Sequence, residues 1–293
     1  DPPHGWPPAE VDITQDLVHG LLVEQHPDLA GQRLHRLGNG WDNVTYRLGP
    51  DLAVRLPRRQ LAVELIANEQ KWLPRLAGHL PVPIPAPVRA GGPGSGYPWP
   101  WSLVPWFDGV VAAVEPLRLD QAAELGRFLR ALHQPGPPDA PHNPFRGVPL
   151  ESRSAPLATR LDRIDPAQLP VPLAAVRDLW AEAHTVPIDV PAVWLHGDLH
   201  PRNVIVAGGE LAAVVDWGDI CVGDPATDLA AAWMQFPPVV HDDFWNAYGD
   251  VTEATWQRAR GWAIAFGLML IDSGHDDASW ADTGRLILER VFS

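Results

Sequence analysis

Polar residues stand at fixed spacing in two neighbouring segments, HGDLHPRN at 196–203 and DWGD at 216–219. Asn203 follows Asp198 by five residues, and Asp216 follows Asn203 by thirteen. Phosphoryl transfer from a magnesium nucleotide uses one carboxylate to orient the attacking hydroxyl and accept its proton, and an amide oxygen and a second carboxylate to hold the metal. The spacing therefore predicts Asp198 as the catalytic base. It predicts Asn203 and Asp216 as Mg²⁺ ligands, because this hard cation prefers oxygen atoms.

Two short apolar runs separate the asparagine from the second aspartate. They are VIV at 204–206 and LAAVV at 211–215, with AGGE between them. Runs of β-branched and apolar residues on either side of a glycine turn predict a β-hairpin. This hairpin would hold Asn203 and Asp216 side by side at its open end, although the two residues are distant in the sequence.

The two segments and the hairpin together resemble the catalytic and metal loops of the aminoglycoside phosphotransferase and choline kinase family. The form HGDxxxxN, with Gly197 where protein kinases carry arginine, is similar to the bacterial small-molecule branch. By motif, the resemblance runs from Leu37 to about Asp228. It implies a two-lobed, protein-kinase-like α+β fold, with a small mixed lobe that contains an antiparallel sheet and a large helical lobe. It also implies transfer of the γ-phosphoryl group of ATP or GTP, with Mg²⁺, to a hydroxyl of a small molecule.

Hydrophobic spacing and turn residues predict the elements of both lobes. In residues 1–106, the predicted nucleotide-binding lobe, we expect helices at 12–29 and 61–76 and strands at 33–37, 44–48, 52–56 and 101–106. In residues 107–293, the predicted lobe for the catalytic loop and the acceptor, we expect helices at 119–133, 157–164, 173–184, 226–235, 242–248, 253–271 and 280–291. Because ligands commonly bind in clefts between domains, the nucleotide is expected between the lobes.

The turn Gly38-Asn39-Gly40 lies between the first two predicted strands. In the kinases that the chain resembles, this position carries a flexible loop over the nucleotide phosphates. Glycine permits positive φ and close approach of the backbone to a ligand. The same residues also suit an ordinary hairpin turn, so two interpretations stay open for this segment.

Arg55 on the third predicted strand departs from the family pattern. Most members carry a lysine there that contacts the α and β phosphates, and Lys71, the only lysine in the chain, lies on the following helix instead. Arginine keeps the positive charge but presents a planar fork rather than an ammonium group. We predict that Arg55 contacts the phosphates and that Glu69 is its partner, with Glu64 as the alternative.

Several residues near the two loops are expected to support them. We predict that His196 hydrogen-bonds the loop backbone, as the family resemblance also implies. Asp219 and Asp224 resemble aspartates that brace the catalytic loop or cap a helix. A competing interpretation takes His196, Asp198 and His200 as part of a zinc site, since zinc proteins combine nitrogen and oxygen ligands.

The net charge of −14, from 36 acidic against 22 basic side chains, excludes a typical nucleic-acid-binding protein and favours a cationic ligand. Family members that modify aminoglycosides bind the polyamine with acidic side chains of the helical lobe. An aminoglycoside or amino-sugar is therefore the predicted acceptor, as in antibiotic resistance. The predicted acceptor-binding residues are Asp272, Asp276 and Asp277, although these also suit a solvated loop.

The single cysteine, Cys221, excludes an intrachain disulfide. Neither a signal peptide nor a membrane span is expected, so we predict a cytoplasmic protein without a membrane partner. Other acceptors stay open, namely a macrolide, an amino alcohol or a sugar. A nucleotide-binding regulator without turnover is a further alternative, which rests on Arg55. A protein kinase is disfavoured because no Ala-Pro-Glu segment follows Asp216.

Overall fold

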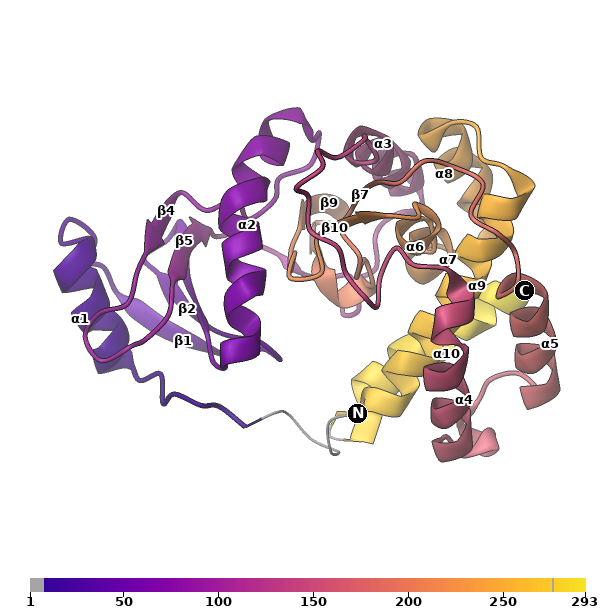
Figure 1. Cartoon of the computed structure of the whole chain (residues 1–293), viewed down its shortest axis with the longest axis horizontal. Coiled ribbons are helices and arrows are strands. Elements are labelled where there is room, and N and C mark those ends of the chain that lie inside the picture. Colours follow the sequence, from indigo (N-terminus) through magenta and orange to yellow (C-terminus); the bar gives the residue numbers. More distant parts are fainter. Residues whose placement is uncertain (1–7, 276) are drawn as a thin grey trace. The chain divides into compact units, whose positions relative to one another are not determined.

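The computed structural model describes residues 8–275 and 277–293 and shows an antiparallel sheet with helices, followed by a mainly helical region (Figure 1). Two compact units divide the chain after Asp108, close to the predicted boundary at 106. Unit 1 holds the described residues up to Gly78 together with Pro83–Asp108, and unit 2 holds His79–Val82 and Gly109–Ser293. The predicted α+β class is confirmed.

Unit 1 is built on a five-stranded antiparallel sheet with the order β1-β2-β3-β5-β4. Tight turns join the first three strands, so each pairs with its neighbour in sequence. The predicted strands are present with small shifts at their ends, and β4 was not predicted. The bounds are β1 Leu34–Asn39, β2 Asn43–Leu48, β3 Leu52–Pro57, β4 Arg89–Gly91 and β5 Trp101–Pro105.

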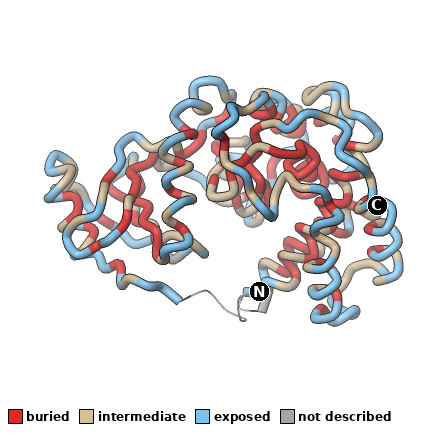
Figure 2. Tube along the Cα trace, viewed as in Figure 1, coloured by how far each residue is buried: buried red, intermediate tan, exposed pale blue. Residues whose placement is uncertain are grey.

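Two helices accompany this sheet. α1 (Gln15–Gln25) begins after Thr14, whose hydroxyl accepts a hydrogen bond from the Leu17 amide at 3.2 Å. It ends before Pro27, well short of the predicted end at 29, because the residue before a proline disfavours helical backbone. The buried side chains of α1 join those of the strands in one hydrophobic core, and Figure 2 shows buried stretches on α1 and on the strands. α2 (Val63–Leu76) carries the buried Glu69.

Unit 2 is mainly helical. Its predicted helices are present, with one exception: the segment expected as one helix over 226–235 forms two short helices that meet at Ala230. The bounds are α3 Ala122–Leu132, α4 Ser154–Arg163, α5 Leu173–Ala183, α6 Ala226–Leu229, α7 Ala231–Gln235, α8 His241–Tyr248, α9 Glu253–Asp272 and α10 Ala278–Phe292. Among the described helices none combines the length and apolar composition that a membrane crossing requires.

Two small sheets interrupt the helices of unit 2. β6 (Val110–Val111), β8 (Val204–Ala207) and β9 (Glu210–Val214) form the first sheet, in which β8 and β9 are the predicted hairpin. β7 (Val193–Leu195) and β10 (Cys221–Gly223) form the second sheet. The chain runs from β7 to β8 through 196–203 and from β9 to β10 through 215–220. Both candidate loops are therefore anchored by a strand at each end.

Candidate active site

The loop 196–203 ends in a short 3₁₀ turn, Pro201–Asn203, which leads directly into β8. His200 precedes this turn, and its Nδ1 accepts a hydrogen bond from the Arg202 amide at 3.2 Å. Proline at the first position of the turn fixes φ and needs no hydrogen-bond partner for its nitrogen. The sequence thus fixes the backbone around Asn203 locally.

The carboxylate of Asp198 is held by three side chains. An Nη2 donor of Arg146 lies 3.0 Å from Oδ1, and His200 Nε2 lies 3.3 Å from Oδ2. The side-chain nitrogen of Asn203, Nδ2, donates to the backbone carbonyl oxygen of Asp198 at 2.8 Å and lies 3.3 Å from Asp198 Oδ2. Burial alone would raise the pKa of Asp198, but the interactions with His200 and Arg146 outweigh it and lower the pKa. Asp198 is therefore an oriented, ionised carboxylate at neutral pH.

Asn203 and Asp216 lie at the open end of the hairpin, as predicted. The Asn203 carbonyl accepts a hydrogen bond from the Val215 amide at 2.9 Å, which places Asp216 next along the opposing strand. The Asn203 amide nitrogen is used in the bonds to Asp198, so its side-chain oxygen is the atom suited to a cation. An amide oxygen and a carboxylate form a donor set that suits Mg²⁺, which completes its shell with phosphate and water oxygens.

Asp216 adopts φ of +62°, in the left-handed region that residues other than glycine rarely occupy. This backbone turns the chain sharply at the end of β9. Such conformations cost of order 1–3 kcal/mol and often occur at functional sites. A strained backbone at Asp216 is consistent with the predicted role of its carboxylate as a Mg²⁺ ligand.

Gly197 brings the two loops together. It has φ of +86°, and a Cβ atom there would lie 2.7 Å from the Asp219 carbonyl oxygen. Contacts this short are essentially never found for real Cβ atoms, so any side chain would push 196–203 away from 215–220. The glycine in HGD is therefore required by the contact between the loops.

His196 ties the loop to the hairpin. Its Nδ1 accepts a hydrogen bond from the Asp198 amide at 3.1 Å, so the ring proton resides on Nε2, which lies 2.9 Å from the Val215 carbonyl oxygen. The ring is fully buried and packs edge-on against Trp217 at 4.7 Å between centroids. Since both ring nitrogens bond the protein, His196 offers none to a metal, and the zinc alternative is wrong for this residue.

Asp228 anchors the same loop from α6. Its carboxylate is fully buried and accepts hydrogen bonds from the amides of His196 at 2.7 Å and Gly197 at 2.8 Å. Two amide donors on one carboxylate form a strong, charge-assisted arrangement. Asp228 therefore holds the backbone immediately before Asp198.

Asp219 and Asp224, the two aspartates predicted to brace the loop, have different partners. Asp219 accepts from Asn143 at 2.6 Å and lies 3.6 Å from Arg146. Burial raises the pKa of Asp219, and the nearby Asp198 adds to this against the opposing effect of Arg146. Asp224 instead pairs through both oxygens with the buried Arg258 on α9, so it holds this helix rather than the loop itself.

The turn after β1 is braced within unit 1. Gly38 has φ of +151°, and the Gly40 amide donates to the Asn43 carbonyl at 2.7 Å, closing a hairpin connection in which Asn39 pairs with Val44. Arg58, at the end of β3, donates to the Gly40 carbonyl at 3.2 Å. Gly38 and Asn39 therefore belong to the end of β1, so the turn is shorter than predicted, and its use by a nucleotide stays a prediction.

Arg55 and Glu69 form the predicted ion pair. Arg55 Nη1 lies 2.7 Å from Glu69 Oε2, and the side chains are 10% and 1% exposed. This pair joins β3 to α2 inside unit 1. Because it is buried, loss of either partner would leave an uncompensated charge. The proposed contact of Arg55 with phosphates stays a prediction.

The three acidic residues predicted to bind the acceptor do not form an open patch among the described residues. Asp272 pairs with Arg163 and lies 3.6 Å from Arg160, both on α4. Asp277 caps α10 by accepting from the Ser279 amide at 2.9 Å. Asp276 lies outside the described residues. The carboxylates of Asp272 and Asp277 are thus already engaged by the protein.

The sequence analysis missed two side chains that touch Asp198. His200 was given only as part of the zinc alternative, and Arg146 was not considered. Arg146 lies in the connection between α3 and α4, where neither helical nor strand periodicity is present. The one available indication was the concentration of acidic residues around the loops, which requires a nearby cation.

The chain matches a known protein family over most of its length. The family model described as "Phosphotransferase enzyme family" matches residues 33–262, which include both loops and the sheet of unit 1. The chain belongs to the phosphotransferase enzyme family. The matched range includes Asp198, Asn203 and Asp216.

Two curated relatives of this chain are kinases by name. A homoserine kinase of Beijerinckia indica is 29% identical over 182 residues, which cover 57% of this chain and 56% of that protein. A hygromycin-B 4-O-kinase of Escherichia coli is 29% identical over 113 residues, which cover 35% of this chain and 31% of that protein. The chain thus matches about half or less of the length of these relatives.

Solved structures show the same fold. The GDP complex of aminoglycoside 2'-phosphotransferase-IIIa has a TM-score of 0.70 at 20% identity, with 94% of this chain and 98% of that chain covered. A macrolide 2'-phosphotransferase from Brachybacterium faecium has a TM-score of 0.60 at 22% identity, with 93% and 98% covered. The chain therefore has the fold of these solved structures.

Proposed function

We propose that the chain transfers the γ-phosphoryl group of a nucleoside triphosphate to a hydroxyl group of a small molecule. The observation that carries this proposal is the convergence of Arg146, His200 and Asn203 on the carboxylate of Asp198. Membership of the phosphotransferase family supports the reaction class. The curated relatives, which by name phosphorylate an amino acid and an antibiotic, support a small acceptor.

In this proposal, Asp198 aligns the acceptor hydroxyl and takes its proton as the bond to phosphorus forms. A loose transition state requires little early proton removal, so orientation of the carboxylate matters more than high basicity. The contacts from Arg146, His200 and Asn203 fix that orientation, and those from His200 and Arg146 also lower the pKa of Asp198. The ionised carboxylate is ready to accept a proton throughout the neutral pH range.

Asn203 and Asp216 would hold Mg²⁺ through their side-chain oxygens. The bound cation would neutralise the charge on the β- and γ-phosphate oxygens. Arg55, held by Glu69, is proposed to contact the phosphates in the role that a lysine has in most of the family. Its planar fork suits bidentate binding of phosphate oxygens. Structural relatives in complex with GDP and with ATP support nucleotide use, and either ATP or GTP is the proposed donor.

Two kinds of acceptor are supported by different observations. The net charge and the aminoglycoside complexes of structural relatives support a cationic amino-sugar and a role in antibiotic resistance. A group of arginines beside Asp198 supports an acceptor of the opposite charge, which is developed in the next subsection. Both are hydroxyl compounds and use the same transfer chemistry.

A coupled assay of nucleoside diphosphate release tests the proposal. The purified chain is incubated with Mg²⁺ and ATP or GTP in the presence of aminoglycosides, macrolides, amino alcohols, sugars and hydroxy acids. We expect release that depends on one acceptor class and falls by about 10²- to 10⁴-fold in Asp198→Asn. Asp178→Asn, an equal change at an exposed position of α5, is the matched control and should retain full activity.

Two results would contradict the proposal. Acceptor-dependent release that survives in Asp198→Asn would remove this residue from the reaction. Nucleotide binding without transfer to any acceptor, and without hydrolysis, would favour a nucleotide-binding regulator, the alternative suggested by Arg55. Nucleotide affinity is therefore measured by calorimetry in parallel.

A further inference from the structure

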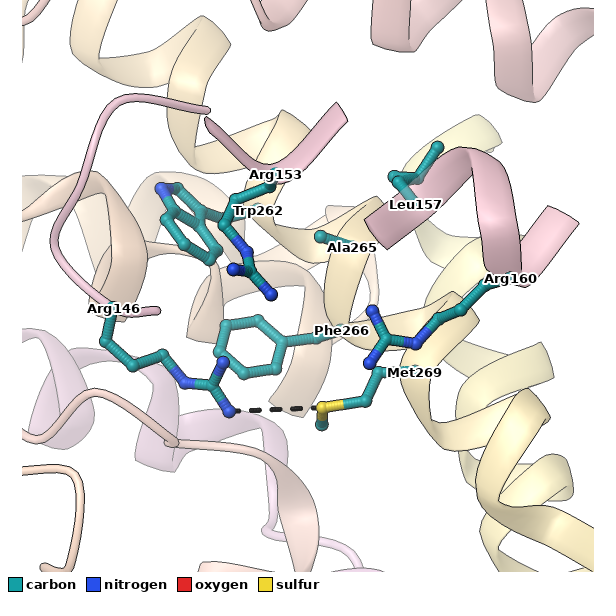
Figure 3. Close-up of a pocket in the computed structure, with 8 residues that line it drawn as sticks. All are labelled: Arg146, Arg153, Leu157, Arg160, Trp262, Ala265, Phe266 and Met269. Carbon is teal, nitrogen blue, oxygen red and sulfur yellow. Dashed lines mark hydrogen bonds between the residues drawn. The ribbon is translucent and has the colours of Figure 1, made fainter. Parts of the chain in front are cut away.

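Three arginines of unit 2 line one pocket, hereafter the arginine pocket. Arg146 comes from the connection after α3, Arg153 from the short turn Leu150–Arg153, and Arg160 from α4. Figure 3 shows their guanidinium groups arranged around the Phe266 side chain. The remaining lining residues are apolar or aromatic and come from α4 and α9: Leu157, Trp262, Ala265, Phe266 and Met269. No acidic side chain is among the described residues that line this pocket.

The donors in the arginine pocket exceed the acceptors that the described residues supply. The Nε groups of Arg146 and Arg160 are buried without a hydrogen-bond partner, and so is the indole nitrogen of Trp262. Asp272 lies 3.6 Å from Arg160 Nε, but it forms its close bonds with Arg163. Buried donors without partners are costly and uncommon in native proteins. The pocket is thus prepared for an added acceptor group.

Electrostatics favour the same kind of ligand. Burial lowers the pKa of Arg153, and the charges of Arg146 and Arg160 lower it further. Burial likewise lowers the pKa of Arg160, where the nearby Asp272 is opposed by Arg146 and Arg163. Like charges that repel one another in a partly buried site are relieved by a bound anion. This convergence occurs in a chain with only 22 basic residues and a net charge of −14, so general surface composition does not explain it.

Arg146 connects the arginine pocket to the catalytic loop. One Nη2 group lies 3.0 Å from Asp198 Oδ1 and 3.9 Å from the sulfur of Met269, a pocket residue. Its guanidinium carbon also lies 5.0 Å from the centre of the Phe266 ring. A molecule anchored in the pocket would therefore lie beside the carboxylate that is proposed to align the acceptor hydroxyl.

We propose that the arginine pocket binds an oxyanion of the acceptor, so that the substrate is a small hydroxyl compound with a carboxylate or phosphate group. This inference rests on the proposed function, because it assigns the acceptor of the same reaction. The guanidinium forks match the oxygen pairs of carboxylate and phosphate.

The inference differs from the sequence-based expectation of a cationic acceptor. That expectation rested on total charge and on Asp272, Asp276 and Asp277. Total charge steers ligands over long range, whereas the groups within hydrogen-bonding distance decide which ligand is retained. In the described part of the chain, Asp272 contacts two arginines, and the pocket beside Asp198 is basic.

Matched acceptors that differ mainly in charge test the inference. One set contains 3-phenyllactate, its neutral amide and the cationic alcohol phenylalaninol, and the second contains glycerol 3-phosphate and glycerol. The first set tests a carboxylate with an aromatic body, and the second tests a phosphate. We expect one of the anions to exceed its matched compounds by about 10- to 100-fold in kcat/KM.

Substitutions of the pocket arginines test whether the preference for an anionic acceptor arises in the arginine pocket. Arg153→Leu and Arg160→Leu should abolish the preference for the anion through KM while nucleotide affinity is unchanged. Arg153→Lys and Arg160→Lys keep the charge and should restore part of it. Arg177→Leu removes an equal charge from an exposed position on α5 and should leave the preference intact. An anion preference that persists in both leucine variants would overturn the inference.

Direct binding separates this inference from the proposed function. Calorimetry with 3-phenyllactate and with glycerol 3-phosphate does not depend on turnover. Anion binding that requires Arg153 and Arg160, without phosphoryl transfer to any compound, would retain the pocket and overturn the kinase proposal. Phosphorylation of aminoglycosides, without anion binding or inhibition, would retain the kinase and overturn the pocket. If neither binding nor transfer occurs, both proposals are wrong.

Discussion

Two arginine sites in unit 2 differ in how their donors are used. Arg258 on α9 is fully buried, and its five N–H groups have five acceptors. The partners of this arginine are two aspartates, a threonine hydroxyl and a backbone carbonyl: Asp224, Asp189, Thr255 and Pro187. In the arginine pocket, Arg146 and Arg160 have buried Nε groups without a partner. Both sites are cationic, but only the first is complete within the protein.

The number of hydrogen-bond partners distinguishes an arginine that stabilises the fold from an arginine that is a candidate for ligand binding. Burial would lower the pKa of Arg258, but hydrogen bonds and charge from Asp224 and Asp189 raise it. For Arg153 and Arg160 the pKa is lowered, because burial and neighbouring arginines outweigh any acidic partner, whereas Asp219 and Asp198 raise the pKa of Arg146 against its burial. A complete site stabilises the fold, whereas an incomplete one lowers stability and is retained for what it binds.

The largest effect on stability is expected at the complete site. Arg258→Ala would leave Asp224 buried without its cation, and breaking such a pair costs about 3–5 kcal/mol of unfolding free energy. Urea denaturation followed by tryptophan fluorescence measures this change. Arg177→Ala, the same change at an exposed position of α5, is the matched control. A loss below about 1 kcal/mol would show that the Arg258 cluster is not a structural anchor.

The pair should also be non-additive. Replacing both partners, in Asp224→Leu with Arg258→Met, removes the two buried charges together and should cost less than the sum of the single changes. Groups in direct contact usually show an interaction energy of about 0.5–3 kcal/mol. The four proteins of this double-mutant cycle are compared by urea denaturation. Strict additivity would contradict the close pairing of Arg258 with Asp224.

Removal of a pocket arginine should affect stability much less than removal of Arg258. Arg160→Leu removes a charge that Arg146 and Arg163 repel and loses a 3.6 Å contact with Asp272, which keeps its bonds to Arg163. The unfolding free energy should therefore stay within about 1 kcal/mol of the unaltered chain or increase. The same urea titration measures it. A loss comparable to that of Arg258→Ala would mean that Arg160 is a structural residue, and it would weaken the assignment of the arginine pocket.

The smallest expected effect concerns Cys221, whose thiol lies 3.9 Å from the Arg146 carbonyl. Burial raises the pKa of this thiol, so it stays protonated in the folded chain and reacts mainly when the structure opens. Labelling by a thiol reagent therefore reports local opening near the arginine pocket. Arg160→Leu should change the labelling rate by less than about fivefold, whereas Arg258→Ala should accelerate it much more.

The residues predicted most successfully are those whose positions depend on nearby sequence. Asn203 and Asp216 flank a hairpin, so turn residues and β-branched runs were enough to place them together. The pairing of Arg55 with Glu69 followed from a strand and the helix after it. The roles of these residues in binding and catalysis stay predictions, since geometry alone does not measure turnover.

The residues that were missed depend on tertiary packing. Arg146 reaches Asp198 from an irregular connection fifty-two residues earlier, and no periodic pattern marks it. β6, β7 and β10 contain two or three residues each and form only because a partner strand is present. Asp272 was interpreted from its acidic neighbours in sequence, whereas its partners lie on α4.

The left-handed backbone of Asp216 has a consequence for how this chain would change under selection. Glycine accepts φ near +62° without strain, so Asp216→Gly would relax the turn while removing a proposed ligand oxygen. A library screened only for heat resistance should enrich glycine or asparagine at this position. A library screened for turnover should keep aspartate. Divergence between the two populations at residue 216 would separate the demands of folding from those of activity at a single site.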